Sequence, residues 1–182
     1  MLDFSKNYFE LFGLPTAFEV DADALAERYL ELQRVVHPDR YANASERERR
    51  LAVQGASHVN EALQVLKEPL ARARYLLSLH GVQVEAGKET TSDPLFLMEQ
   101  MELRESLAEA RSRDDPYGVI SAIMGRLQAQ SGTLIDALSA QFADPTPENL
   151  DAARENVRKM QFLEKLRSDA ENLEAELDDE LM

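Results

Sequence analysis

Apolar residues recur at helical spacing along nearly the whole chain, and no segment shows the regular alternation of apolar and polar residues that is typical of strands. Before position 81 this spacing predicts four helices, over residues 7–12, 21–36, 45–67 and 70–80. The third begins with a capping box, because Ser45 is followed three residues later by Glu48. We therefore expect an all-α protein.

The second part of the chain contains three helix starts of one kind. Each has an oxygen-bearing cap residue followed by a proline at the first helical position: Asp93-Pro94, Asp115-Pro116 and Thr146-Pro147. Three such starts predict a three-helix bundle. The polar segment 81–92 (GVQVEAGKETTS) interrupts the helical pattern before them. We expect two domains, over residues 1–80 and 93–182, joined by a linker over residues 81–92.

Two of the predicted helices carry apolar stripes that can face each other when residues are placed about 100° apart around each axis. The stripe of the first helix comprises Ala22, Leu25, Tyr29, Leu32 and Val36. The stripe of the second comprises Ala52, Ala56, Val59, Leu63 and Leu66. These stripes predict an antiparallel helical hairpin, closed by the loop over residues 37–44.

The tip of this hairpin contains the run His37-Pro38-Asp39-Arg40. Proline has no amide donor and disfavours helical geometry in the residue before it, so it ends the helix near Val36 and predicts a stiff, exposed turn. Taken alone, the run favours a simpler interpretation, in which Pro38 ends a helix and its polar neighbours are solvated. Its surroundings change that interpretation.

Composition and charge narrow the possible functions. The net charge is −14, and it is uneven: residues 1–80 carry 12 acidic and 10 basic side chains, whereas residues 81–182 carry 22 and 10. The acidic half repels a phosphate backbone, so we expect no nucleic-acid partner. The chain has no cysteine, which excludes disulfides, thiolate metal ligands and cysteine nucleophiles. Without a long apolar segment or a signal-peptide pattern, we expect a cytoplasmic protein with no membrane partner.

The residues around the turn resemble a J domain across residues 1–75, and three further regions narrow the resemblance to the HscB family, the J-type co-chaperones of iron–sulfur cluster assembly. The J-domain part of the resemblance is carried by residues 8–14 (YFELFGL), the turn itself, and residues 59–62 (VNEA). The family part is carried by residues 72–81 (RARYLLSLHG), 96–104 (FLMEQMELR) and 157–166 (VRKMQFLEKL).

The resemblance implies that the turn docks on the ATPase domain and interdomain linker of an HscA-type heat-shock chaperone and promotes ATP hydrolysis. The implied docking residues are His37, Pro38, Asp39, Arg28, Arg34 and Arg40. The Asp39 carboxylate can accept charge-assisted hydrogen bonds from a partner arginine, and the arginines suit an acidic partner surface. Many J domains have a strongly basic second helix, whereas Glu27 and Glu31 accompany the arginines of this one.

The helix predicted over residues 94–113 has two apolar faces, although a bundle helix needs only one. One face suffices for the core and comprises Phe96, Leu103, Leu107 and Ala110. The other comprises Leu97, Met98, Met101 and Ala108 and is bordered by glutamates. Either this second face packs on another part of the protein, or it is an exposed binding surface with a polar rim.

In the HscB family a surface of this kind binds the iron–sulfur scaffold protein IscU. The resemblance assigns that role to Leu97, Met98, Met101, Glu102, Glu105, Glu109 and Phe162. Acidic residues in this set imply a basic area on the client. Phe162 lies at the margin of an apolar stripe, so a core role is equally compatible with its position.

Two other functions remain open at this point. A J-domain adaptor for a different client has the same features, and a plain helical structural protein is a third class. An enzyme is not expected, because there is no glycine-rich phosphate loop or nucleophile elbow, and His58 and His80 have no companions at ligand spacing. We expect a monomer without cofactor or metal.

Overall fold

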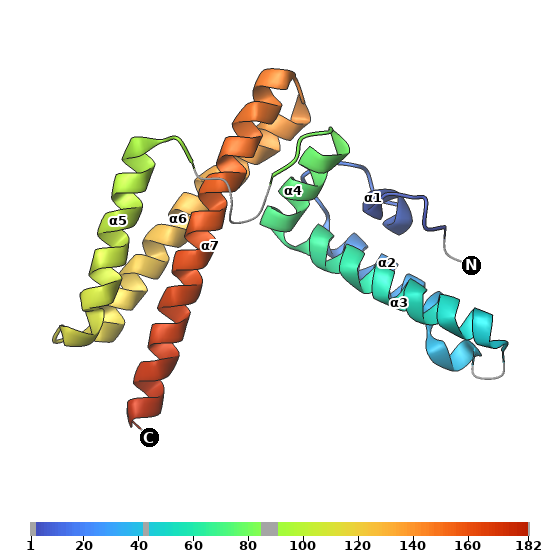
Figure 1. Ribbon diagram of the computed structural model, residues 1–182, viewed down its shortest axis with the longest axis horizontal. Helices are drawn as coiled ribbons and strands as arrows, with labels where there is room; N and C mark the ends of the chain where they lie inside the picture. The colour runs from blue at the N-terminus through green and yellow to red at the C-terminus, as the bar shows by residue number, and fades with distance from the viewer. Residues whose placement is uncertain (1–2, 42–43, 85–90, 182) are drawn as a thin grey trace. The chain divides into compact units, whose positions relative to one another are not determined.

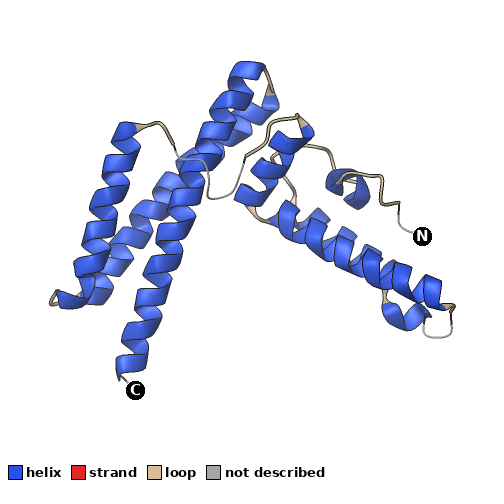
Figure 2. Ribbon diagram, in the orientation of Figure 1, coloured by secondary structure: helices blue, strands red, loops and turns tan. Residues whose placement is uncertain are grey.

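The computed structural model describes residues 3–41, 44–84 and 91–181, and every regular element within these ranges is a helix (Figure 2). None of the described helices is both long and apolar enough to cross a membrane. The chain divides into two compact units, residues 1–80 and 81–182. The prediction of an all-α protein is therefore confirmed.

The described residues of the first unit form the helices α1 (Tyr8–Phe12), α2 (Ala22–Val36), α3 (Glu46–Lys67) and α4 (Pro69–Leu79), which Figure 1 labels, and the short 3₁₀ segment η1 (Pro38–Tyr41) after α2. Side-chain caps start α2 and α3. The Asp21 carboxylate accepts hydrogen bonds from two amides of the first turn of α2, and Ser45 and Glu48 form the expected capping box of α3.

Helices α2 and α3 form the predicted hairpin. The apolar residues Leu25 and Val36 of α2 are buried, as are Val59 and Leu66 of α3. A polar link supplements this core, because Asn60 Oδ1 accepts hydrogen bonds from the Tyr29 hydroxyl (3.0 Å) and from Gln33 Nε2 (2.8 Å). Ala22, the first residue of α2, is exposed and does not contribute to the stripe as expected.

The second unit is a bundle of three long helices: α5 (Pro94–Glu109), followed by the 3₁₀ segment η2 (Ala110–Ser112), then α6 (Pro116–Ala143) and α7 (Pro147–Leu181). All three predicted cap-and-proline starts are correct. The expected helix over residues 94–113 is shorter, because α5 tightens into η2 after Glu109. The core of the bundle is formed by apolar side chains from all three helices: Leu103, Leu107, Ile120, Ile123, Leu127, Leu163 and Leu166.

Polar contacts reveal the directions of the three bundle helices. Asp93 and Arg111, at opposite ends of the segment that contains α5, pair with Lys159 and Glu176 of α7, so these two helices run parallel. The Tyr117 hydroxyl, near the start of α6, donates to Asp178 near the end of α7, so α6 runs antiparallel to α7.

Within the expected linker over residues 81–92, residues 85–90 lie outside the described part of the chain. Thr91 is buried, its hydroxyl donates to the Glu155 carboxylate of α7, and the Ser92 amide donates to the same carboxylate at 3.0 Å. The last two residues of the expected linker are therefore attached to the bundle.

Candidate functional site

The turn after α2 is shaped by its proline. His37 has φ −57° and ψ 126°, the extended geometry that a following proline imposes, and the chain then makes one 3₁₀ turn over η1. His37 Nδ1 accepts a hydrogen bond from the Asp39 amide at 3.3 Å. The Asp39 carboxylate lies 3.6 Å from the same ring nitrogen.

Both polar side chains of the turn face solvent. The His37 side chain is 55% exposed and that of Asp39 is 90% exposed. Two contacts outside the tripeptide attach the turn to the end of α2: Arg40 Nη1 donates to the Arg34 carbonyl at 2.8 Å, and the Tyr41 hydroxyl donates to the Val35 carbonyl at 3.1 Å. Tyr41 was not among the predicted residues. These contacts fix the direction in which His37 and Asp39 point.

The three arginines of the predicted docking set differ in their surroundings. Arg28 pairs with Glu31 at 2.8 Å, and both side chains are more than half exposed. Arg40 is engaged with the backbone of α2, as described above. Arg34 is exposed and forms no ion pair with any described acidic residue, so its charge is the most available of the three.

A further group of exposed arginines, Arg47, Arg49 and Arg50, lines a shallow depression at the start of α3 together with Val53, which is 58% exposed. Their run in the sequence, ERERR, was the available clue, but it resembles an ordinary solvated helix face. Because α3 packs against η1, these charges belong to the same end of the hairpin as the turn.

Helix α5 has a buried and an exposed apolar face in the structure. Leu103 and Leu107 are 2% and 7% exposed, whereas Met98 and Met101 are 55% and 62% exposed. Leu97 is half-buried, and Ala108 is exposed. Exposed methionines can adapt to irregular partner surfaces, because the side chain is unbranched and flexible.

The three glutamates assigned to the client surface are all exposed, but they are not equivalent. Glu109 pairs with Arg113 one turn further along the chain. Glu102 and Glu105 have no ion-pair partner among the described residues. The available negative charge of this surface therefore lies next to Met98 and Met101.

Phe162 lies between the two roles that the sequence left open. Its side chain is half-buried, and its ring packs edge-on against Phe96, with ring centroids 6.3 Å apart and planes at 78°. Phe96 in turn packs on the bundle core. Phe162 thus contacts the start of α5 and is still partly exposed.

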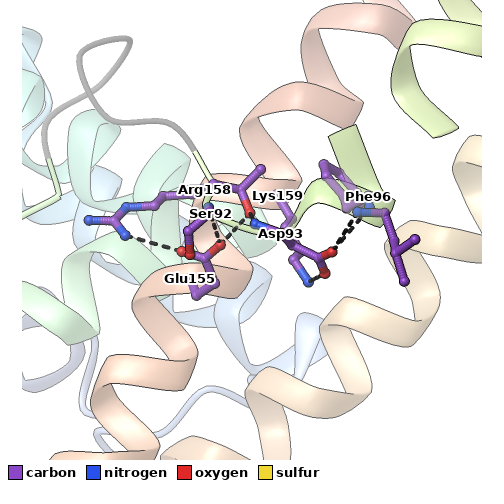
Figure 3. Close-up of polar contacts among 8 residues, drawn as sticks. Ser92, Asp93, Phe96, Glu155, Arg158 and Lys159 are labelled. Atoms are coloured by element: carbon purple, nitrogen blue, oxygen red, sulfur yellow. Dashed lines mark hydrogen bonds and ion pairs between the residues drawn. The ribbon is translucent and has the colours of Figure 1, made fainter. Parts of the chain in front are cut away.

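A polar network fastens the start of α5 to α7 (Figure 3). The Asp93 carboxylate accepts from the amides of Leu95 and Phe96, both at 3.1 Å, and from Lys159 Nζ at 2.7 Å. The Lys159 ammonium also lies 5.5 Å from the centre of the Phe96 ring. Glu155 adds a second link, since it accepts from the Ser92 amide and from Arg158 Nη1 at 3.1 Å.

This network perturbs both of its carboxyl groups. The hydrogen bond from Lys159 lowers the pKa of Asp93, and the amides of Phe96 and Leu95 add to the effect. Burial by itself raises the pKa of Glu155, but hydrogen bonds from Thr91, Arg158 and Ser92 outweigh it, so the pKa is lowered. Both carboxylates are held in the charged form. The sequence indicated the cap residue Asp93 but not its partner Lys159.

The two remaining histidines, His58 and His80, do not belong to a group of metal-binding side chains among the described residues. His58 is half-buried, with its ring 5.4 Å from the rings of Phe4 and of Tyr8, and His80 is exposed at the end of α4. Within the described ranges, no three His, Asp or Glu side chains converge in a way that could hold a metal ion.

A helical hairpin with an exposed His-Pro-Asp turn, followed by a separate three-helix unit, defines a J-domain protein with a helical C-terminal domain. Comparisons with known proteins agree. Residues 92–171 match the family described as "HSCB C-terminal oligomerisation domain". The chain is 43% identical over 171 residues to a Co-chaperone protein HscB homolog of Vibrio cholerae, covering 94% of this chain and 98% of that protein. A homolog from Shewanella loihica is 42% identical and covers 92% and 97%.

Two solved structures share the fold over 94% of this chain. The chaperone HscB from Vibrio cholerae matches with a TM-score of 0.83 at 42% identity and is covered to 99%. The human co-chaperone protein HscB matches with a TM-score of 0.86 at 30% identity and is covered to 84%. The chain belongs to the HscB family of co-chaperones.

Proposed function

We propose that this protein stimulates the ATPase of an HscA-type heat-shock chaperone and delivers the iron–sulfur scaffold protein IscU to it, assisting cluster transfer. The observation that carries the proposal is the presence of two exposed surfaces of different chemistry on two separate units. The stiff polar turn of His37, Pro38 and Asp39 lies on the first unit, and the apolar, glutamate-bearing face of α5 lies on the second.

The turn is suited to act on an ATPase because its geometry exists before docking. Proline and the contacts of Arg40 and Tyr41 hold the backbone, so little ordering entropy is lost when the partner binds. Among the described residues, the Asp39 carboxylate has only the His37 ring, at 3.6 Å, as an ion-pair neighbour, so it can receive a partner arginine. Positive charge from Arg34, and from Arg28 once it leaves Glu31, favours encounter with an acidic chaperone surface.

The face of α5 is suited to hold a protein client. Leu97, Met98 and Met101 supply apolar area, and Glu102 and Glu105 supply charge for a basic region of the client. Phe162, which packs against Phe96 of α5, adds a half-buried aromatic ring. In this proposal the protein is a cytoplasmic monomer that acts by binding alone, with no catalysis, cofactor, nucleic acid or membrane.

The docking part of the proposal is tested with His37→Gln. Steady-state ATP hydrolysis by an HscA-type chaperone, measured with IscU present, should fall from the stimulated rate to near the unstimulated rate, because the docking turn loses its imidazole. Binding of IscU by the variant should stay unchanged, since α5 belongs to the other unit.

His80→Gln is the matched control, because His80 is an exposed histidine at the end of α4, outside the turn. It should stimulate the chaperone like the unmodified protein. Full stimulation by His37→Gln would show that the turn does not dock. If the unmodified protein stimulates the chaperone's ATPase normally but does not bind IscU, an adaptor for a different client is favoured.

A further inference from the structure

Leu95, in the first turn of α5, is the most exposed large apolar side chain in the described part of the protein. It is 75% exposed, compared with 62% for Met101 and 58% for Val53. A single exposed leucine is ordinary on a protein surface. This one is not isolated, because it lies three residues before Met98 on the same helix, where side chains are neighbours.

The position of Leu95 is held from two sides. Its own amide donates to the cap residue Asp93 at 3.1 Å, and Asp93 is fixed to α7 by Lys159 at 2.7 Å (Figure 3). The turn that presents the side chain is therefore rigid before any partner arrives. An apolar group on a rigid turn loses little entropy when a partner covers it.

Leu95 also widens the exposed apolar face of α5. With about 100° between successive residues, Leu95 lies about 60° from Met98, on the side opposite Leu97 and Met101. The apolar surface of the first two turns then covers an arc of about 160°, from Leu97 through Met101 and Met98 to Leu95. A flat partner contacts a narrower stripe than this.

The exposed residues of α5 also change in character along the helix axis. The exposed residues of the first two turns are apolar, whereas the next two turns expose Glu102, Arg104 and Glu105, and neither of these glutamates has a described ion-pair partner. A partner that covers this face must offer apolar surface at one end and positive charge at the other.

We propose that Leu95 is a further client-contact residue, and that the client encloses the first two turns of α5 in a concave apolar surface with basic side chains over Glu102 and Glu105. This inference rests on the proposed function, because it specifies the shape and chemistry of the same client. Leu95 and Leu97 then mark the two edges of the enclosed surface.

The test is the affinity of the full-length protein for purified IscU, measured by titration calorimetry. Leu95→Ala and Leu97→Ala should each raise Kd about three- to tenfold, as expected for truncation of a buried contact residue. Leu95→Met should stay within about twofold of the unmodified protein, because it keeps the apolar area. Leu30→Ala, on α2 of the other unit, is the control, because Leu30 is 58% exposed and lies outside both proposed surfaces, and it should leave Kd unchanged.

The outcomes separate this inference from the proposed function. If Met98→Ala with Met101→Ala weakens IscU binding but Leu95→Ala does not, the client covers a narrower face and the inference is wrong, while the proposed function stands. If the unmodified protein does not bind IscU, the proposed function fails and the inference fails with it. The inference is supported if Leu95→Ala and Leu97→Ala raise Kd equally, while the melting temperature and the stimulation of the chaperone in the absence of IscU stay unchanged.

Discussion

At the scale of single residues, Lys159 combines two kinds of interaction that position a neighbouring helix. Its ammonium pairs with Asp93, and it lies over the ring of Phe96. Both contacts act on the first turn of α5. The side chain is only 19% exposed, so the pair is less screened by solvent than the surface pairs of the same bundle.

We predict that Lys159→Met lowers stability in a pH-dependent way. Methionine keeps an apolar stem over Phe96 but removes the charge. Because Lys159 lowers the pKa of Asp93, its stabilisation is complete above the ordinary carboxyl pKa of 3.8 and disappears as the pH falls through the lower value of the folded protein. The melting temperature should drop by roughly 2 °C near neutral pH and match the unmodified protein in acid.

Arg167→Met is the control for this measurement. Arg167 is half exposed and pairs with Glu164 on its own helix, so its loss should change the melting temperature very little. A difference between Lys159→Met and the unmodified protein that stays constant down to pH 3 would contradict the assignment to Asp93.

At the scale of the element, α5 is a helix with two apolar faces that serve different purposes. Leu103 and Leu107 are buried against α6 and α7, and Met98 and Met101 face away from the core. Periodicity showed both faces but could not rank them. Only the exposures of the folded chain distinguish the core face from the surface face.

Substitutions on the two faces should therefore have opposite effects. Leu103→Ala should lower the free energy of unfolding by about 2–5 kcal/mol, because it leaves a cavity in the bundle core. Met98→Ala with Met101→Ala should change that free energy by less than about 1 kcal/mol, and should raise the Kd for IscU about tenfold or more.

Denaturant unfolding and calorimetric titration of the same preparations provide the comparison. A marked loss of stability in the double methionine variant would place these side chains in a packed interface, and the client surface would have to lie elsewhere.

The limits of periodicity are visible in the same helix. Gln100 is 4% exposed and donates to Gln130 of α6 at 3.1 Å, although its polar side chain gave no reason to place it in the core. The end of α5 at Glu109, four residues before the predicted end, was also missed, because the chain tightens there into η2, which packs against α6.

At the scale of the whole molecule, the two proposed tasks reside on different units of one chain. Recruiting a client to a chaperone requires that both surfaces belong to the same molecule, because the covalent connection supplies the high local concentration. We predict that His37→Gln and the variant with Met98→Ala and Met101→Ala do not complement each other when mixed. With IscU present at a concentration near its Kd, ATP hydrolysis by the chaperone should remain low in the mixture.

The reference is a triple variant that carries His37→Gln, Met98→Ala and Met101→Ala on one chain, mixed with an equal amount of unmodified protein. This mixture should show the stimulation of its unmodified half. Recovery of full stimulation by the two separate variants would mean that the tasks are independent, and delivery would then not require one chain to hold both partners.

The sequence by itself determined the features that depend on neighbouring residues. Helix starts at Asp21, Ser45 and Asp93, and the stiff turn at Pro38, follow from caps and backbone geometry within about four residues of chain. The resemblance to the HscB family also rests on local runs of sequence, and the comparisons confirm it.

Tertiary structure alone decided the features that join distant residues. Lys159 reaches Asp93 across 66 positions, the ring of Phe162 packs against that of Phe96, and Leu95 is left exposed because no described helix covers its side of α5. A helical pattern specifies the direction of each side chain around its own axis. It does not specify what stands opposite, because that depends on how the three helices of the bundle pack.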